Sequence, residues 1–391
     1  MNLLFYSTDS RPLIGGIASC LDSWLTGLAE NGNHVQIVSA LKPQYVSEVG
    51  NLEPRPYSEK WLSIPQRSSS FVDSFFPARK LRSYFYMQRR NRWLLSQMVS
   101  YIDQRPDWVI FSFVNPDCCI ALARAKQLGI PCAAIAYGSE LHPKHQPNPA
   151  WVRKTLQQMD QVIVISNYTQ KLVMNWGVPI EKSAIIHPGL TQDFSKRRIP
   201  SLKNNQLINE IKIVTACRLI ERKGVQTLLA AVARLKVQGI AVRLEIIGEG
   251  PYRFDLEKEV NRLGINDEVK FCGQVNNEQR QLIFANADVF ALTPFETEDG
   301  DVEGFGIVYV EAGFEGLPTI GSFSGGVPDA VQDNITGLLV PPQNEVALAE
   351  ALEKLASDPI LRNKLGKAGQ SWALDHKPAF LGKQLNSLLE R

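Results

Sequence analysis

Short apolar runs alternate along this chain with longer segments in which apolar residues return every three or four positions. The run from Leu3 to Ser7 predicts a buried strand. The segment after it predicts a helix ending at Gly32, because apolar residues recur at helical spacing at Ile17, Leu21, Trp24, Leu25 and Leu28. Further strands are predicted at 35–39, 108–113, 131–137 and 161–166. Strands that alternate with helices indicate a parallel sheet with right-handed crossovers.

The alternation stops at a polar, irregular stretch and then starts again. Residues 190–210 contain Pro200 and three consecutive cations, a composition typical of a linker. A second series of strands and helices opens at Ile211. We therefore expect an α/β protein with two doubly wound, Rossmann-like domains, 1–189 and 211–374, that face each other across a central cleft. The sequence leaves open whether the last helix, within 375–391, completes the first domain.

Composition narrows the class of protein. With 391 residues, 44% hydrophobic and 21% charged, the chain is long enough for two cores and typical of a soluble globular protein. A net charge of +2 argues against a nucleic-acid binder. None of the six cysteines forms a C-x-x-C pair, and no apolar run approaches the roughly 20 residues of a membrane span. We expect a cytoplasmic protein whose N-terminus is a strand and not a signal peptide.

Two glutamates flank a glycine turn in the second domain. Glu303 precedes Gly304-Phe305-Gly306, and Glu311 follows within an apolar helical segment. Backbone N–H groups at a helix start attract phosphate, glycines allow close approach, and carboxylates accept hydrogen bonds from sugar hydroxyls. We interpret the pair as part of a nucleotide-sugar site. The simpler interpretation, a solvated loop acid and a surface helix acid, requires Glu311 to interrupt an apolar helix, where a carboxylate needs a cleft or a partner.

Four motifs in the second domain resemble those of the retaining glycosyltransferases of family 4, which have the GT-B fold. They are Arg218 to Gly224 (R-L-x-x-x-K-G), Glu303 to Glu311 (E-x7-E), Gly325-Gly326-Val327-Pro328-Asp329, and Gly337-Leu338-Leu339-Val340-Pro341. In the first domain, Gly15-Gly16 and His187-Pro188-Gly189 also fit the family. Asp301 and Val302, immediately before Glu303, resemble the residues found there in the mannosyltransferase branch that builds phosphatidylinositol mannosides.

The resemblance implies a role for each matching residue. Arg218 and Lys223 would neutralise the departing diphosphate without a metal, so no cofactor is expected. Glu303 would bind donor-sugar hydroxyls and Glu311 the ribose. The other donor-binding candidates act through their backbones: Gly304, Phe305 and Gly306 at the sugar and phosphate, Gly15 and Gly16 at the diphosphate, and Gln274 and Val275 at the base.

The chain departs from the family at one position. Many members carry histidine in an H-G-x-[DE] motif, and the matching stretch here begins with Tyr137 and ends with Glu140. Tyrosine does not accept a proton readily near pH 7. Tyr137, Glu140 and His142 stay candidates for the acceptor or catalytic side, and the sequence leaves the general base open.

Two patterns in the second domain imitate other sites. Asp299-Gly300-Asp301 spells the D-x-D metal motif of a different glycosyltransferase fold, but here it precedes a helix of a doubly wound domain. Gly248-Glu249-Gly250 begins a dinucleotide fingerprint, but Arg253 stands where the third glycine is needed. We expect neither a metal nor a nicotinamide cofactor.

A basic, aromatic segment at 79–92 carries six cations and no acid. Such a helix suits an anionic membrane surface, although a solvated face beside the acceptor is an equal explanation. The sequence as a whole predicts transfer of a hexose, mannose or glucose, from a GDP- or UDP-linked donor to a hydroxyl of a glycan or lipid-linked glycan, without nucleic acid. The alternatives are a non-catalytic nucleotide-sugar-binding protein of the same fold and a nicotinamide-dependent oxidoreductase.

Overall fold

The structure is a computed structural model that describes residues 1–8, 10, 15–41, 53–63, 97–114, 118–142, 149–191 and 210–391. The chain forms two compact units. The first unit comprises Met1–Ile165, Thr169–Gln192 and Pro378–Arg391, and the second comprises Ser166–Tyr168 and Asp193–Lys377. The basic segment 79–92 and nearly all of the predicted linker 190–210 lie outside the described residues.

A seven-stranded parallel sheet in the order β3-β2-β1-β4-β5-β6-β7 organises the first unit. Its strands are β1 (Asn2–Ser7), β2 (His34–Leu41), β3 (Ser58–Ser63), β4 (Trp108–Phe111), β5 (Cys132–Ala136), β6 (Gln161–Val164) and β7 (Ser183–Ile185). Its helices include α1 (Gly16–Glu30), α5 (Cys118–Gln127), α6 (Pro149–Gln157), α7 (Asn167–Asn175) and α16 (Pro378–Leu389). The interior strand β5 is buried at every position, as expected for a strand covered on both faces.

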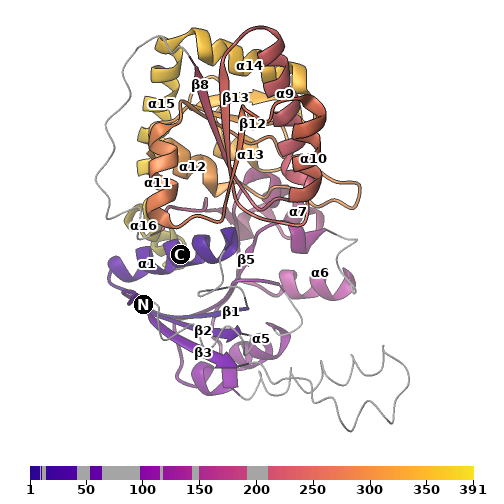
Figure 1. The fold of residues 1–391 in the computed structure, drawn as a ribbon. Helices are drawn as coiled ribbons and strands as arrows, with labels where there is room; N and C mark the ends of the chain where they lie inside the picture. Colours follow the sequence, from indigo (N-terminus) through magenta and orange to yellow (C-terminus); the bar gives the residue numbers. More distant parts are fainter. Residues whose placement is uncertain are drawn as a thin grey trace. The chain divides into compact units, whose positions relative to one another are not determined.

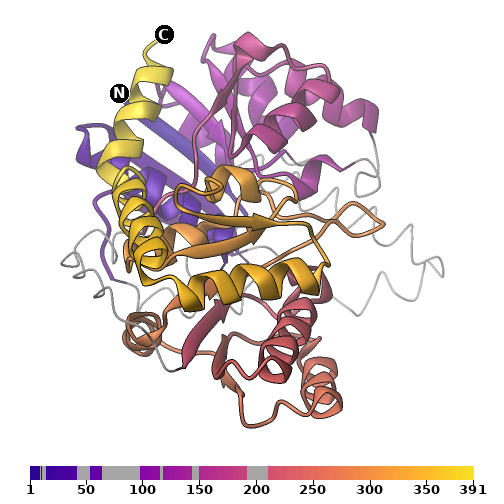
Figure 2. The same cartoon turned by 90° about the horizontal axis from the view of Figure 1, so that it is seen from above.

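The last helix, α16, packs against α1 in the first unit (Figures 1 and 2). Glycines make this close approach possible, because a Cβ at Gly27 or Gly382 would lie closer than 3.0 Å to the backbone of the other helix. The Asn31 amide donates to the Ala379 carbonyl at 3.0 Å, and the Trp108 indole donates to the Leu389 carbonyl at 2.9 Å. These contacts join the C-terminal helix to the N-terminal fold, which the sequence had left open.

The second unit contains a six-stranded parallel sheet in the order β10-β9-β8-β11-β12-β13. Its strands are β8 (Ile211–Ala216), β9 (Val242–Ile247), β10 (Val269–Gly273), β11 (Val289–Ala291), β12 (Thr319–Ser322) and β13 (Gly337–Val340). Its α-helices are α9 (Val225–Val237), α10 (Arg253–Leu263), α11 (Asn277–Asn286), α12 (Ile307–Phe314), α13 (Val327–Ala330), α14 (Glu345–Ser357) and α15 (Pro359–Leu374). Helices α9 and α10 lie on one side of this sheet, and α11 and α12 lie on the other (Figure 1).

The strand order reverses between β8 and β11, which are neighbours in the sheet. The loops that follow their carboxyl ends therefore lie side by side, where doubly wound sheets bind ligands. The sequence prediction of two parallel, doubly wound sheets is confirmed. It did not include the edge strands β3, β7 and β13, which are short or rich in polar residues. Among the described residues, no helix combines the length and apolar character needed to cross a membrane.

Candidate functional site

The loop after β8 carries Arg218 and is held by the loop after β9. The Leu219 amide donates to the Glu249 carbonyl at 2.9 Å. A Cβ at Gly248 would lie closer than 3.0 Å to the Cys217 carbonyl, and one at Gly250 would crowd the Leu219 backbone. The two glycines of the Gly-Glu-Gly pattern are therefore explained by packing against the Arg218 loop. Arg218 itself is exposed.

Lys223 ends a short 3-10 helix, Glu221–Lys223, that is fixed against the loop after β11. Gly224 follows with a left-handed backbone (φ 71°), and a Cβ there would lie closer than 3.0 Å to the Thr293 carbonyl. The Phe295 amide donates to the Arg222 carbonyl at 2.9 Å. These contacts bring the side chains of Arg222 and Lys223 to the acid-rich loop that begins at Thr297.

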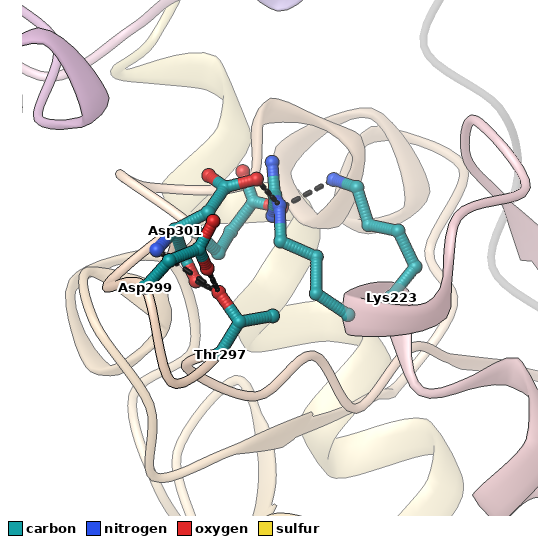
Figure 3. A network of polar contacts seen from close by, with 6 residues as sticks. Lys223, Thr297, Asp299 and Asp301 are labelled. Carbon is teal, nitrogen blue, oxygen red and sulfur yellow. Dashed lines mark hydrogen bonds and ion pairs between the residues drawn. The ribbon is translucent and has the colours of Figure 1, made fainter. Parts of the chain in front are cut away.

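That loop is folded around the Thr297 side chain. The Asp301 amide donates to the Thr297 hydroxyl at 3.0 Å, and the Gly300 amide donates to the Thr297 carbonyl at 2.8 Å. The Thr297 hydroxyl also bonds the Asp299 carboxylate. Figure 3 shows Thr297 pointing toward Asp299 and Asp301, with Lys223 reaching in from its own turn. The loop thus presents Asp301, and two residues later Glu303, to the cations.

Four charged side chains meet at this point: Arg222, Lys223, Asp301 and Glu303. Arg222 Nε lies 2.7 Å from Asp301 Oδ2, and Arg222 Nη1 lies 3.5 Å from Glu303 Oε2. Lys223 Nζ pairs with the same Glu303 oxygen. Burial alone would raise the pKa of Glu303, but the charges of Lys223 and Arg222 outweigh it and hold the pKa below its usual value. Glu303 is therefore a carboxylate at neutral pH.

The same charged side chains affect the pKa of the neighbouring Cys217. Burial raises the pKa of the Cys217 thiol to about 11, with Lys223 and Arg222 acting in the opposite direction. The thiol is therefore protonated at neutral pH.

The turn from Glu303 to Gly306 packs against the second glycine motif. The Gly326 amide donates to the Glu303 carbonyl at 2.8 Å. A Cβ at Gly325 or Gly326 would lie closer than 3.0 Å to the backbone of Glu303 or Gly304. Both glycines are thus needed where the two segments meet, and this contact fixes the backbone that starts α12.

Phe305 and Gly306 anchor the turn from behind. The Phe305 ring is buried and stacks on Trp372 and His376, with ring centroids 6.3 and 6.4 Å apart. Gly306 caps α12 with a left-handed backbone (φ 93°). The Phe305 side chain therefore belongs to the core, which leaves its backbone for any contact with a ligand.

Glu311, on α12, has a cationic partner. Its carboxylate pairs with the Arg280 guanidinium of α11, and the two side chains are 10% and 24% exposed. The sequence predicted that a carboxylate in this apolar helix would need a cleft or a partner, but it did not identify Arg280. Gln274 and Val275 lie between β10 and α11, and Gln274 is exposed. Asn276 caps α11 in a reciprocal capping box with Gln279.

In the first unit, Tyr137 and Glu140 share a tight turn after β5. Glu140 is 5% exposed, and its carboxylate accepts the Tyr137 amide at 2.5 Å. Burial raises the pKa of Glu140 to about 7, and hydrogen bonds from the backbone of Tyr137, Gly138 and Glu140 itself only partly oppose it. The Tyr137 ring lies against Phe113 with centroids 6.3 Å apart. His142 follows the turn and is half-buried.

Gly15 and Gly16 are exposed at the start of α1, where a Cβ would meet open space. Their backbone conformation does not by itself require glycine, since Gly15 is extended (φ 166°). The structure therefore gives no packing reason for these glycines.

No group of three or more His, Cys, Asp and Glu side chains within the described ranges is arranged to hold a metal ion. The aspartates of the D-x-D pattern instead contact Thr297 and Arg222.

Family models match both halves of the chain. The model described as Glycosyltransferase Family 4 matches residues 14–194, and the model described as glycosyl transferases group 1 matches residues 199–372. The chain consists of a glycosyltransferase family 4 domain followed by a glycosyl transferases group 1 domain. The resemblance drawn from the four sequence motifs is thereby confirmed.

Curated relatives agree with the branch suggested by the sequence. A GDP-mannose-dependent alpha-(1-6)-phosphatidylinositol monomannoside mannosyltransferase of Mycobacterium tuberculosis is 34% identical over 54% of this chain and 57% of its own length. The chain thus spans a little more than half the length of that relative. The putative colanic acid biosynthesis glycosyltransferase WcaL of Escherichia coli is 27% identical over 69% of this chain and 68% of its own length.

Solved structures share the fold. Anabaena HepE, solved in complex with UDP, superposes with a TM-score of 0.76 at 18% identity and covers 100% of both chains. WaaG, a glycosyltransferase involved in lipopolysaccharide biosynthesis, has a TM-score of 0.66 at 16% identity and covers 99% of both chains. The predicted GT-B fold is confirmed.

Proposed function

We propose that this protein transfers a hexose from a nucleoside-diphosphate sugar to a hydroxyl of a glycan or lipid-linked glycan, with retention of the α linkage. The observation that carries the proposal is the pairing of Lys223 with Glu303 beside the glycine turn that opens α12. A cation for a diphosphate, a carboxylate for a sugar and a helix start for phosphate then belong to one small region of the second unit.

Each side chain of this region receives a role. Lys223 and Arg218 neutralise the diphosphate, and Glu303 accepts hydrogen bonds from the hexose hydroxyls. Glu311 binds the ribose. The remaining donor contacts come from backbone groups, at Gly304, Phe305 and Gly306 for sugar and phosphate and at Gln274 and Val275 for the base.

The transfer balances without an external base. The bond between the sugar C1 and the phosphate oxygen breaks, and a bond from C1 to the acceptor oxygen forms on the same face. The acceptor proton passes to the departing phosphate oxygen, so a nucleoside diphosphate and a glycoside are the products. Two fixed cations stabilise the charge that develops on the leaving group. We therefore assign no metal to the reaction and no proton transfer to Tyr137.

The donor and acceptor are inferred from chemistry and from the relatives. The M. tuberculosis relative is GDP-mannose-dependent, and the Anabaena neighbour was solved with UDP. We therefore propose mannose or glucose carried by GDP or UDP. We assign acceptor recognition to the first unit, with Tyr137, Glu140 and His142 as candidates and with Gly15 and Gly16 as backbone contacts to the diphosphate.

A thermal-shift panel tests the donor assignment. UDP, GDP, UDP-glucose and GDP-mannose are added to the protein without metal, because a ligand that binds only the folded state raises its melting temperature. We expect stabilisation by one nucleotide and its sugar conjugate. Transfer to an alkyl mannoside, followed by NMR of the new anomeric linkage, then tests retention. No shift with any of the four ligands would overturn the proposal.

The second candidate is a non-catalytic nucleotide-sugar-binding protein, favoured by the tyrosine at position 137. Binding without donor hydrolysis or transfer would support it. The oxidoreductase alternative loses its only motive, because Gly248 and Gly250 are explained by packing. Membrane contact through 79–92 stays a proposal, and flotation with anionic vesicles at low salt tests it.

A further inference from the structure

The carboxylate of Glu303 has two cationic neighbours that come from one turn and differ in how they are held. Lys223 contacts Glu303, and within the described part of the chain no other acid pairs with it. Arg222 contacts Glu303 at 3.5 Å and Asp301 at 2.7 Å. The lysine is thus free to leave for another anion, whereas the arginine is tied to a second acid.

The anchor of Arg222 is itself well fixed. Asp301 is held through its backbone by Thr297, with the Thr297 amide donating to the Asp301 carbonyl at 3.0 Å. The Arg222 carbonyl accepts the Phe295 amide, so its backbone is bound to the segment that leads into the same loop. The Arg222 side chain is only 14% exposed. A planar guanidinium can serve two carboxylates from one position, which an ammonium group does less well.

A donor would compete for Lys223 but not for Arg222. A bound diphosphate would carry more negative charge than one carboxylate and would therefore draw Lys223 away from Glu303. Glu303 then needs another cation if it is to stay ionised and directed at the sugar. We propose that Arg222, fixed by Asp301, is a positioning residue that holds Glu303 in place while Lys223 binds the diphosphate. This inference rests on the proposed function.

The aspartates of the D-x-D pattern then have a structural role. Asp301 anchors an arginine, and Thr297 with Asp299 shapes the loop that presents it. The six residues drawn in Figure 3 then act together to orient the carboxylate of Glu303.

The test separates affinity for the sugar from affinity for the nucleotide. Calorimetry measures Kd for UDP and UDP-glucose, or for GDP and GDP-mannose, in wild type, Arg222→Met, Arg222→Lys and Asp301→Asn. We expect Arg222→Met to change the Kd of the nucleoside diphosphate less than about 3-fold. The advantage of the sugar nucleotide over the free nucleotide should fall about 10-fold, and kcat should fall at least as far. Asp301→Asn should show a smaller loss of the same kind, and Arg222→Lys a partial rescue.

The pH profile gives a second readout. The titratable groups around Glu303 are Lys223, Arg222, Asp301, Cys217 and Tyr309. Cys217 and Tyr309 are neutral near pH 7 because burial raises their pKa values. Loss of the Arg222 charge should therefore move the acid limb of kcat toward higher pH. The matched control is Arg262→Met, which removes an exposed arginine paired with Glu259 and should behave as wild type.

Three results would overturn the inference. Wild-type behaviour of Arg222→Met would show that Glu303 does not need the arginine. An equal loss for nucleotide and sugar nucleotide would show that Arg222 binds phosphate directly. Loss of folding in Arg222→Met, together with full activity in Arg222→Lys and Asp301→Asn, would show a purely structural role. Failure of the wild type to bind any nucleoside diphosphate is a different outcome, because it overturns the proposed function itself.

Discussion

Gly224 lies so close to Thr293 that a side chain at position 224 would collide with the Thr293 carbonyl. The contact joins the turn that carries Lys223 to the segment that leads into the acid-rich loop. Gly224→Ala should therefore destabilise the folded protein for two separate reasons. The left-handed backbone (φ 71°) costs an alanine about 1 kcal/mol, and the collision adds about 2 kcal/mol. Chemical denaturation measures the sum, and nucleotide binding should weaken with it.

Gly264→Ala is the matched control for that substitution. Gly264 also has a left-handed backbone (φ 65°) in the second unit, but a Cβ there would meet open space. It should cost only the conformational term, about 1 kcal/mol. Equal losses for the two variants would mean that the contact with Thr293 contributes nothing.

Removal of the Glu303 carboxylate should separate binding from transfer. Glu303→Ala keeps Lys223 and Arg218 to bind the diphosphate and loses the group that accepts hydrogen bonds from the sugar hydroxyls. We expect the Kd of UDP or GDP to be unchanged or lower, because Lys223 no longer has a competing partner. Turnover should fall by about 100-fold or more, as for the loss of a contact made with the reacting sugar. Unchanged turnover would remove Glu303 from the site.

Arg218 should contribute to diphosphate binding. It is exposed on the loop held by Gly248 and Gly250, so its loss should not disturb the core. Arg218→Ala should weaken binding of UDP or GDP by about 10-fold while the binding of the free nucleoside stays the same. Calorimetry with both ligands distinguishes the phosphate contact from a general loss of affinity. Equal affinity of the variant and the wild type for the diphosphate would contradict this role.

The alternation of strands and helices could be predicted because it depends on local geometry, and so could the glycine turn that ends at Gly306 and opens a helix. The packing of Gly326 against Gly304 could not, because it joins segments that are distant in sequence. The family motifs did place Lys223 and Glu303 in one region.

Arg222 and Arg280 could not be predicted, because their partners are distant in sequence. Arg222 and Asp301 are 79 positions apart, and no spacing rule joins them. Glu311 gave a partial signal, since an acid in an apolar helix needs a partner, but any cation of the domain could have met that need. The D-x-D pattern lies in a doubly wound domain, as the sequence predicted, but its contact with Arg222 depends on the fold.

The pair of Arg280 and Glu311 should be coupled in stability. Arg280→Met leaves a nearly buried carboxylate without its cation, and Glu311→Gln does the reverse. Because both side chains keep some exposure, each single change should cost about 2 kcal/mol and not the full penalty of a buried charge. The double variant should lose less than the sum of the two. Urea denaturation of all four proteins measures the coupling, and strict additivity would deny it.

The same variants report on the ribose. If Glu311 binds the ribose hydroxyls, Glu311→Gln should reduce the preference for UDP or GDP over the 2′-deoxy analogue, while Arg280→Met reduces it less. The exposed pair of Arg262 and Glu259 serves as control, since its disruption should cost less than about 0.5 kcal/mol and leave the preference intact. An unaltered preference in Glu311→Gln would place the ribose elsewhere.

Glu140 should make the stability of the first unit depend on pH. Burial raises its pKa to about 7, above the value of about 4.5 expected in the unfolded chain, so the folded state binds more protons between those values. Folding stability therefore falls as pH rises through this window, by about 2–3 kcal/mol between pH 5 and pH 8. Glu140→Gln keeps an oxygen acceptor for the Tyr137 amide and removes the titration. Relative to the wild type, its melting temperature should gain roughly 4–8 °C between pH 5 and pH 8. The exposed Glu181→Gln should show no such gain, and parallel curves for Glu140→Gln and wild type would mean that Glu140 ionises freely in the folded protein.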